Sequence, residues 1–346
     1  MLYNSKNNYI SIAKALGIIL MVVGHSGCPF VISKFIYIFH MPLFFVCSGY
    51  FFKEISDQSS LQSFYIKRMK GLYLPYLKWS MLFILSHNSF RYLHITESVI
   101  YQKEDYVRQF IKMITMTDHE LLIRPFWFIK ELLLTSLIVA TISYISSNLS
   151  IKKRIEPLFV IALIASVVSK LIPPVPLFGD CSILCLSVLY YYSGILINKY
   201  KRYIPLTYTT LLLSFIIVVF GSFFLNGSID MRFTNINNQI PYYLLSITGI
   251  IMIFCISKKL ESDKSILLYY IGNHTMPILA LNLLALKLGN LIKIGIYSFP
   301  IEYLSSYTVI PNYNNWFWLV YTIIGVTTPL SIYFIYTKFI HTFISH

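Results

Sequence analysis

Ten long stretches of almost purely apolar residues recur along this chain and leave few folds open to it. A helix that crosses the hydrocarbon core of a bilayer needs about 20 such residues, and in lipid only helices or closed barrels satisfy every backbone hydrogen bond. The sequence therefore predicts an all-α, polytopic membrane protein of about ten transmembrane helices, at residues 10–29, 33–52, 72–90, 125–146, 157–172, 181–198, 204–225, 239–257, 265–286 and 314–338.

The composition agrees with this interpretation. Hydrophobic residues make up 56% of the 346 residues and charged residues only 12%, whereas a soluble domain has about 25% charged residues. Too little polar surface remains to face water, and no linker or low-complexity tract divides the chain. We therefore expect one integral-membrane domain over residues 1–346, with 91–124 as the only loop large enough to form a cap outside the membrane.

The net charge of +14 comes from 28 Lys and Arg residues against 14 Asp and Glu residues. In a soluble protein such an excess would suggest nucleic acid, but here it fits the basic cytoplasmic loops that fix membrane topology. The expected environment is a lipid bilayer, with no nucleic-acid partner. Basic residues gather after the second, fourth, sixth and eighth stretches, so both termini and the loop 53–71 should be cytoplasmic and the loop 91–124 should lie outside.

The first apolar stretch carries two ionisable residues, Lys14 and His25, which are expensive inside a membrane and are therefore functional candidates. They are eleven residues apart, which places them within about 20° of one helix face and roughly 16 Å apart along the axis. Both should face one groove, Lys14 near the cytoplasmic end and His25 near the outer end. Gly17 and Gly24 form a neighbouring stripe that would let another helix approach closely. The alternative is that Lys14 reaches the interface and His25 only caps the helix end.

The second stretch, FIYIFHMPLFFVCSGYFF, adds a further histidine. It should run antiparallel to the first, which places His40 in the outer half, at a depth near that of His25. Pro42 removes one helical hydrogen bond and should kink the helix and widen the space beside His40. Ser48 and Gly49 lie nearer the level of Lys14, although small residues often serve only helix packing.

Several segments together resemble the acyltransferase family 3 membrane proteins. Lys14 and His25 fit that family's Arg/Lys-x10-His motif, and HMPLFFVCSGYFF looks like its second-helix signature. FYIKRMKGLYLPY (64–76) is similar to its basic segment before a proline, and PFWFIKELL (125–133) resembles the Trp-Phe opening of a later helix. The resemblance implies a membrane enzyme that O-acylates cell-surface glycans, and we expect it in the bacterial cytoplasmic (inner) membrane.

The resemblance also implies the substrates. Acyl-CoA, most commonly acetyl-CoA, would be the donor, and a glycan or lipid-linked saccharide the acceptor. Arg68 and Lys70, with Ser48 and Gly49, are the expected donor-binding residues, and Lys14 joins His25 and His40 in the catalytic set. No bound cofactor and no metal are expected, because the histidines lack zinc spacing and have no carboxylate partner nearby in the sequence. The oligomeric state stays open.

Two positions depart from the family pattern. The basic segment has Lys70 beside Arg68, rather than arginine throughout. Lysine makes a less bidentate phosphate contact than arginine. YIGNHTMPILALNLL resembles a family segment that often ends in His, but Asn282 holds that place here. The part that this ninth stretch plays in the site is therefore left open.

The residues support one mechanism, in which His25 activates an acceptor hydroxyl as general base and His40 polarises the thioester carbonyl or shares the proton. A covalent acyl-histidine intermediate is equally compatible. The alternative class is a polysaccharide polymerase, flippase or secondary transporter, which would place key charges in an outer loop or on broken helices at mid-membrane. The Lys14/His25 face argues against that class, and the charged loop 91–124 argues mildly for it. A purely structural membrane protein would leave His40 beside Pro42 unexplained.

Overall fold

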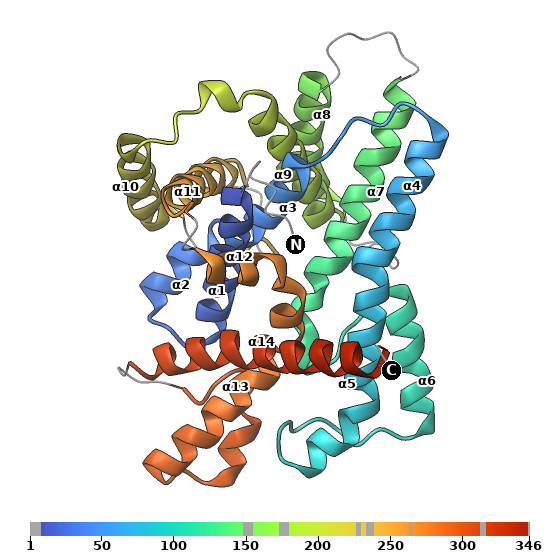
Figure 1. The fold of residues 1–346 in the computed structure, drawn as a ribbon, viewed down its shortest axis with the longest axis vertical. Coiled ribbons are helices and arrows are strands. Elements are labelled where there is room, and N and C mark those ends of the chain that lie inside the picture. Colours follow the sequence, from blue (N-terminus) through green and yellow to red (C-terminus); the bar gives the residue numbers. More distant parts are fainter. Residues whose placement is uncertain are drawn as a thin grey trace.

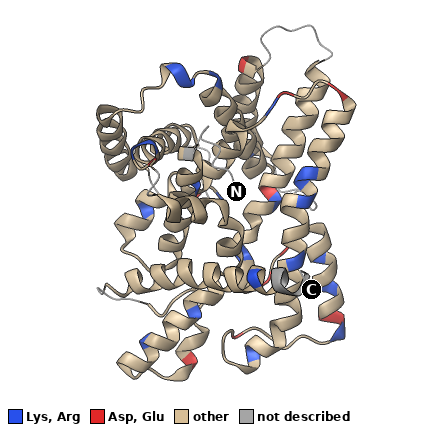
Figure 2. Cartoon of the chain, viewed as in Figure 1, with Lys and Arg blue, Asp and Glu red and all other residues tan. Residues whose placement is uncertain are grey.

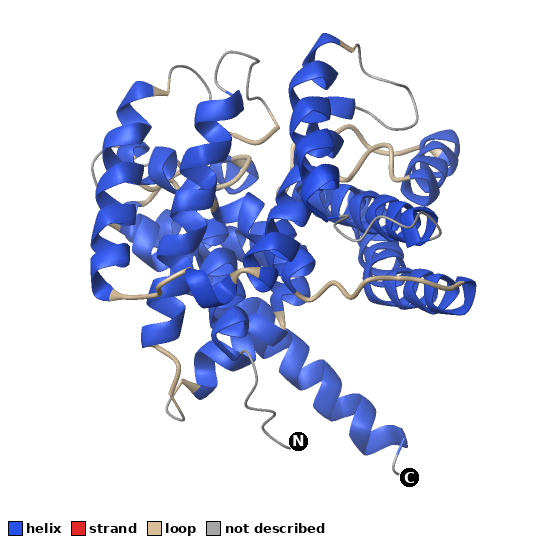
Figure 3. Ribbon diagram, turned by 90° about the horizontal axis from the view of Figure 1, so that it is seen from above, coloured by secondary structure: helices blue, strands red, loops and turns tan. Residues whose placement is uncertain are grey.

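The computed structural model describes residues 8–147, 155–172, 180–225, 230–232, 239–262, 265–311 and 316–344. Within these ranges every regular element is a helix, which confirms the all-α prediction (Figures 1 and 3). The α-helices are α1 (Asn8–His25), α2 (Phe30–Tyr37), α3 (His40–Tyr50), α4 (Gln58–Arg68), α5 (Leu74–Tyr92), α6 (Lys103–Thr115), α7 (Trp127–Ser147), α8 (Ile155–Val168), α9 (Cys181–Lys199), α10 (Tyr208–Phe224), α11 (Gln239–Lys259), α12 (Ile266–Asn273), α13 (Thr275–Tyr297) and α14 (Phe317–Ile344).

Six helical segments in the described residues are long and apolar enough to cross a membrane: Phe30–Tyr50, Leu121–Ser147, Cys181–Lys199, Gln239–Lys259, Thr275–Tyr297 and Phe317–Phe339. Shorter apolar helices lie at Tyr9–His25 and Tyr208–Phe224. All ten predicted stretches contain a helix. Charged residues, coloured blue and red in Figure 2, are sparse along these helices, so their surface is suited to lipid.

The third predicted helix is longer than expected. Residues 58–92 form one continuous rod of α4, a π-helical turn η1 (Met69–Tyr73) and α5, so that most of the segment expected as a cytoplasmic loop is helical. This rod runs up the right of Figure 1 beside α7. Pro75 explains the π turn, because its missing N–H cannot bond the carbonyl of Gly71. The register shifts by one residue instead, and Leu74 N–H bonds the carbonyl of Met69.

The second predicted helix is broken between α2 and α3, at Ile38 and Phe39. The break lies just before Pro42, which thus sits in the first turn of α3, where a missing N–H is tolerated. The carbonyls freed at the break all find donors. His40 Nδ1 lies 2.9 Å from the Ile36 oxygen. The other two carbonyls bond α11, with Tyr242 OH at 3.2 Å from the Tyr37 oxygen and Ser246 Oγ at 2.5 Å from the Ile38 oxygen.

The ninth predicted stretch is broken in the same way. Helix α12 ends at Asn273 and α13 begins at Thr275, two residues before Pro277. His274 stands at the break, and its Nδ1 lies 2.7 Å from the carbonyl oxygen of Tyr270, four residues earlier, just as His40 contacts Ile36. At both breaks a histidine ring therefore contacts the carbonyl oxygen four residues earlier, shortly before a proline. At His274 the backbone N–H bonds the same oxygen, at 3.1 Å.

Helix α1 packs against α2, α3 and α11 to α14, so its residues lie inside the bundle. The predicted glycine stripe does allow this approach. A Cβ at Gly17 would meet Leu43 of α3 at 2.8 Å, and a Cβ at Gly24 would meet the Tyr37 ring of α2 at 3.3 Å. The glycines thus set α1 directly against the broken α2–α3 helix, which brings the two candidate histidines into one region.

Candidate active site

A cavity of about 310 Å³ opens between α1, α3, the α4–α5 rod, α7 and the start of α13. It is concave, mostly apolar and carries only a few polar groups, as small-molecule sites usually do. Three residues predicted for the site line it, namely Lys14, Ser48 and Arg68. The remaining lining residues are Ile18, Met21, Met41, Phe44, Cys47, Phe51, Gly71, Leu72, Phe128, Ile129, Leu132, Thr275, Met276 and Leu279.

One end of the cavity is cationic. The Arg68 guanidinium donates to Tyr191 OH at 3.1 Å and lies 4.9 Å from the centre of the Phe64 ring. Lys14 faces the cavity close enough to Cys47 for the two to interact electrostatically. In the described part of the chain no carboxylate forms an ion pair with either cation. Half-buried cations without an anion make this end suited to a negatively charged ligand.

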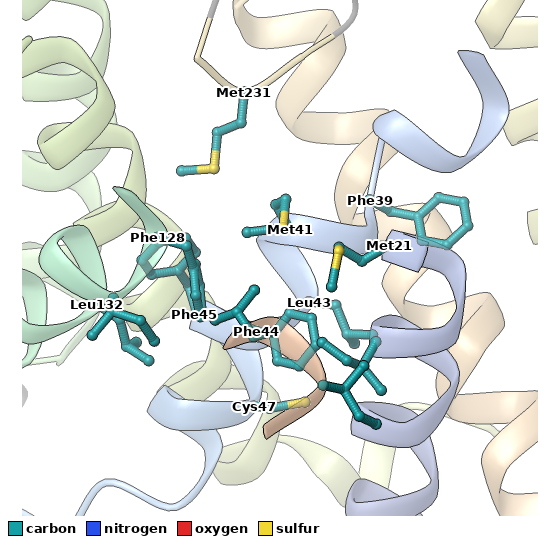
Figure 4. Close-up of a cluster of buried hydrophobic side chains, with 14 of the residues drawn as sticks. Met21, Phe39, Met41, Leu43, Phe44, Phe45, Cys47, Phe128, Leu132 and Met231 are labelled. Atoms are coloured by element: carbon teal, nitrogen blue, oxygen red, sulfur yellow. The ribbon is translucent and has the colours of Figure 1, made fainter. Parts of the chain in front are cut away.

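The other end is apolar. Figure 4 shows Met21 of α1, Met41 and Phe44 of α3, and Phe128 and Leu132 of α7 gathered around this space. Methionine and phenylalanine side chains adapt to irregular apolar groups. Met21 is seven residues from Lys14, so the cavity extends about 10 Å along α1. The cavity can therefore hold an elongated ligand with an anionic head and an uncharged tail.

The two histidines lie just beyond this apolar end. His25 is one helical turn after Met21, and His40 directly precedes Met41. The structure brings the rings close enough to interact electrostatically, as the antiparallel arrangement predicted. His40 is 3% exposed, and its ring meets the Tyr37 ring edge to face at 5.0 Å. His25 is half-buried and forms no hydrogen bond with a described residue, and neither histidine lines the cavity itself.

The contacts of His40 fix its tautomer. Nδ1 faces the carbonyl oxygen of Ile36, which can only accept a hydrogen bond, so Nδ1 carries the proton. Nε2 is then left with its lone pair. The Ile36 carbonyl at the helix break thus accepts from the His40 ring as well as from Phe39 N–H, at 3.2 Å, and the contact with the ring orients it.

Two of the predicted donor-binding residues lie elsewhere. Lys70 is exposed and is not part of the cavity lining, where Gly71 is found instead. Gly49 faces α9, since a Cβ there would lie 1.9 Å from the Tyr191 carbonyl oxygen. Gly194 makes the reciprocal approach, with its Cβ position 2.1 Å from the Val46 oxygen. Gly49 therefore serves the contact between α3 and α9, while Ser48 beside it faces the cavity.

The first turn of α13 contributes residues that the sequence did not predict. Thr275, Met276 and Leu279 line the cavity because the break at His274 redirects the chain toward it. The signal available in the sequence was Pro277, which marks a break as Pro42 does. Asn282 is fully buried farther along α13, and its Nδ2 donates to the Ile278 and Leu279 carbonyls at 3.0 and 2.8 Å. The ninth stretch thus reaches the cavity through its start rather than through Asn282.

Comparison with known proteins gives one match. A family model described as an acyltransferase domain matches residues 7–336, which is nearly the whole chain. No curated protein and no solved structure matches the chain. The match agrees with the resemblance drawn from the motifs, and it includes every residue of the cavity and both histidines.

Proposed function

Because the chain belongs to this family of membrane acyltransferases, we propose that it transfers an acyl group, in the simplest case acetyl, from acyl-CoA to a hydroxyl of a cell-surface or lipid-linked glycan. The acyltransferase match sets aside the polymerase, flippase and transporter alternatives. The identities of the donor, the acceptor and the acyl group go beyond what the family match shows.

One observation carries the choice of donor: the cavity joins two cations, neither of which has a carboxylate partner among the described residues, to an apolar end from which Met21 and Met41 lead on to the two histidines. Acyl-CoA has the matching layout, with phosphates at one end and a slender, uncharged pantetheine arm that ends in the thioester. Arg68 and Lys14 would bind phosphate oxygens through charge-assisted hydrogen bonds. The arm would run past Phe44 and Met21, and the thioester would reach the level of His25.

The histidines would then perform the transfer. His25 accepts the proton of the acceptor hydroxyl while the hydroxyl oxygen attacks the thioester carbonyl. The carbon–sulfur bond breaks, CoA leaves as a thiolate, and the proton on His25 returns to the sulfur. His40, with its lone pair on Nε2, is placed to share the proton or hold the hydroxyl. Removal of water around the apolar end would limit hydrolysis of the thioester.

The topology proposed from the basic loops agrees with this chemistry. With both termini in the cytoplasm, the Arg68 end would face the compartment that contains acyl-CoA, and His25 would lie toward the outer face. Transfer would thus carry an acyl group from a cytoplasmic donor to an acceptor at the outside of the bacterial cytoplasmic membrane.

The proposal is tested with the purified full-length protein in lipid nanodiscs and ¹⁴C-acetyl-CoA. The expected result is saturable binding of acetyl-CoA, which desulfo-CoA should displace, and transfer of label to a glycan extract from the source cells. Mass spectrometry of surface glycans with and without the gene should show a matching loss of acetyl groups. Absence of acetyl-CoA binding by folded protein would contradict the proposed donor, and label transfer to protein or lipid alone would contradict the proposed acceptor.

A further inference from the structure

A second and larger cavity, of about 850 Å³, lies between the end of α5, the 93–124 segment and the 299–307 segment. It shares no lining residue with the first cavity. Its walls carry tyrosine rings and carboxylates rather than methionine and phenylalanine. Sugar-binding surfaces need such groups, because hydroxyls donate to carboxylates and pyranose rings pack on aromatic faces. The volume lies within the range of small-molecule sites.

One wall of the second cavity is held by a buried polar cluster. His87 Nδ1 and Glu120 Oε2 lie 2.9 Å apart, with side chains only 5% and 7% exposed. Tyr101 OH donates to Glu120 Oε1 at 2.9 Å, and its ring stacks on His87 at 3.4 Å. These contacts tie α5 to two separate parts of the 93–124 segment. The wall is therefore formed before a ligand arrives, which favours binding.

The opposite wall is held by a row of buried polar residues on α13. Lys287 donates to the carbonyls of Leu304 and Ser306, at 3.1 and 2.5 Å. Asn290 and Lys293, which follow at three-residue intervals on the same face, bond the backbone at residues 304 and 310. Ser305 Oγ then donates to Glu97 Oε1 at 2.6 Å and joins the two walls. Hydrogen bonds of buried polar side chains thus hold both walls of the second cavity in place.

One residue in the lining of the second cavity lies near the tyrosine that contacts His40. Tyr307, in its lining, lies within electrostatic range of Tyr37, and Tyr37 contacts the His40 ring and donates to the Gly24 carbonyl at 3.4 Å. Arg124, which also lines the second cavity, is one helical turn before Phe128 of the first cavity. The second cavity is therefore adjacent both to the tyrosine that contacts His40 and, through Arg124, to a helix that lines the first cavity.

The charges in the second cavity define what it can accept. Its lining holds one guanidinium, that of Arg124, against four carboxylates, those of Glu97, Asp118, Glu120 and Glu302. Lys112, outside the lining, pairs with Asp118 at 2.9 Å, and Lys287, buried behind the wall, lies near Glu97. Burial lowers the pKa of His119 to about 4, so this imidazole adds no positive charge near neutral pH. The four carboxylates then face the three cations Arg124, Lys112 and Lys287, so the cavity keeps a small excess of negative charge.

We propose that this second cavity binds the acceptor, and that the acceptor is a glycan without acidic groups. The assignment rests on the proposed acyl transfer. Carboxylates such as Glu302 accept hydrogen bonds from sugar hydroxyls, and Tyr307 brings an aromatic ring to the lining, with the Arg124 guanidinium 5.6 Å from its centre. A carboxylate or phosphate on the sugar would meet uncompensated negative charge and be rejected.

Binding is measured by isothermal titration calorimetry on the full-length protein in nanodiscs, with three probes: maltotriose, tri-N-acetylchitotriose and trigalacturonic acid. At least one neutral trisaccharide should bind, and the acidic one should bind at least tenfold more weakly. Tyr307→Ala and Glu302→Gln should each weaken neutral binding about tenfold, the size of one charge-assisted hydrogen bond. Glu302→Lys should reduce the difference in affinity between the neutral and the acidic trisaccharides. The matched control is Glu104→Gln, an exposed carboxylate of α6 outside the lining.

Two results would overturn the assignment. One is failure of all three probes to bind, and the other is binding that neither Tyr307→Ala nor Glu302→Gln changes. Acetyl-CoA binding, measured on the same samples, separates this outcome from failure of the proposed function. Sugar binding without acetyl-CoA binding would contradict the donor assignment alone, whereas acetyl-CoA binding without selective sugar binding would contradict the second cavity alone.

Discussion

Replacement of Arg68 by glutamine should remove the enzyme's preference for a donor that carries phosphates. Arg68 is half-buried, faces the first cavity and has no carboxylate partner among the described residues, so its charge is available to a ligand. Glutamine removes that charge but retains a hydrogen-bond donor on a shorter side chain. A hydrogen bond to a charged group contributes about 1.5–3 kcal/mol, which corresponds to roughly a 10- to 100-fold change in affinity.

The assay compares acetyl-CoA with acetyl-pantetheine, which carries the same thioester and no phosphate. We expect Arg68→Gln to lower kcat/KM for acetyl-CoA by roughly 10- to 100-fold, mainly through KM, because the contact is remote from the reacting carbonyl. The rate with acetyl-pantetheine should stay within about twofold of wild type, since no phosphate contact is lost. The control is Lys67→Gln, an exposed residue one position earlier that does not line the cavity.

An equal loss of rate with both donors would contradict a role of Arg68 in binding the phosphates of acetyl-CoA. Arg68 would then act on the chemistry or on the local structure rather than on the phosphates. The exposed position of Lys70 gives a further comparison, because Lys70→Gln should raise the KM for acetyl-CoA less than Arg68→Gln does.

Three further predictions follow from the same contacts. The double variant His25→Ala/His40→Ala should transfer acyl groups little more slowly than the worse single variant, because members of a catalytic unit are strongly non-additive; full additivity in log rate would remove His40 from the site. Gly49→Ala should lower the free energy of unfolding by about 1–3 kcal/mol, since its Cβ would overlap the Tyr191 carbonyl. The measurement is the melting temperature in detergent, which should fall. Gly71→Ala has nothing within 4 Å of its Cβ and is the matched control; equal destabilisation by both would show that the α3–α9 contact is not the cause. A cysteine at Ser63, on exposed α4, should react with an impermeant maleimide only in inverted vesicles, and labelling in intact cells would reverse the proposed topology.

The fold class and half of the site followed from sequence because they depend on local rules. Apolar stretches long enough to cross a bilayer can only be helices, and the spacing of Lys14 and His25 places them on one face whatever surrounds them. The antiparallel second stretch then had to bring His40 to a similar depth. Each of these inferences needed one helix or two consecutive helices. The structure confirms the helical fold and places Lys14 in the lining of the first cavity, whereas neither histidine lines it.

The rest of the site depends on contacts between distant segments. Residue spacing could not show that Gly49 faces α9, because a small residue beside Ser48 fits either a ligand or a neighbouring helix. The π turn at Met69–Tyr73 depends on Pro75, and it extends the helix through a segment whose basic residues suggested a loop. The cavity residues from α13 depend on the interruption of the helix at His274, which lies more than 200 residues after α3. The second cavity joins the 93–124 and 299–307 segments, which no local pattern connects.

If acyl-CoA bound in the first cavity is attacked with the help of His25, then His25→Ala should separate donor binding from acyl transfer. The folded variant should bind acetyl-CoA with near wild-type affinity, because His25 does not line the donor cavity. Its rate of acetyl transfer should fall about 10²- to 10⁴-fold, the usual contribution of a general base. A variant that retains more than about a tenth of the wild-type rate, against the loss expected of a general base, would contradict the claim.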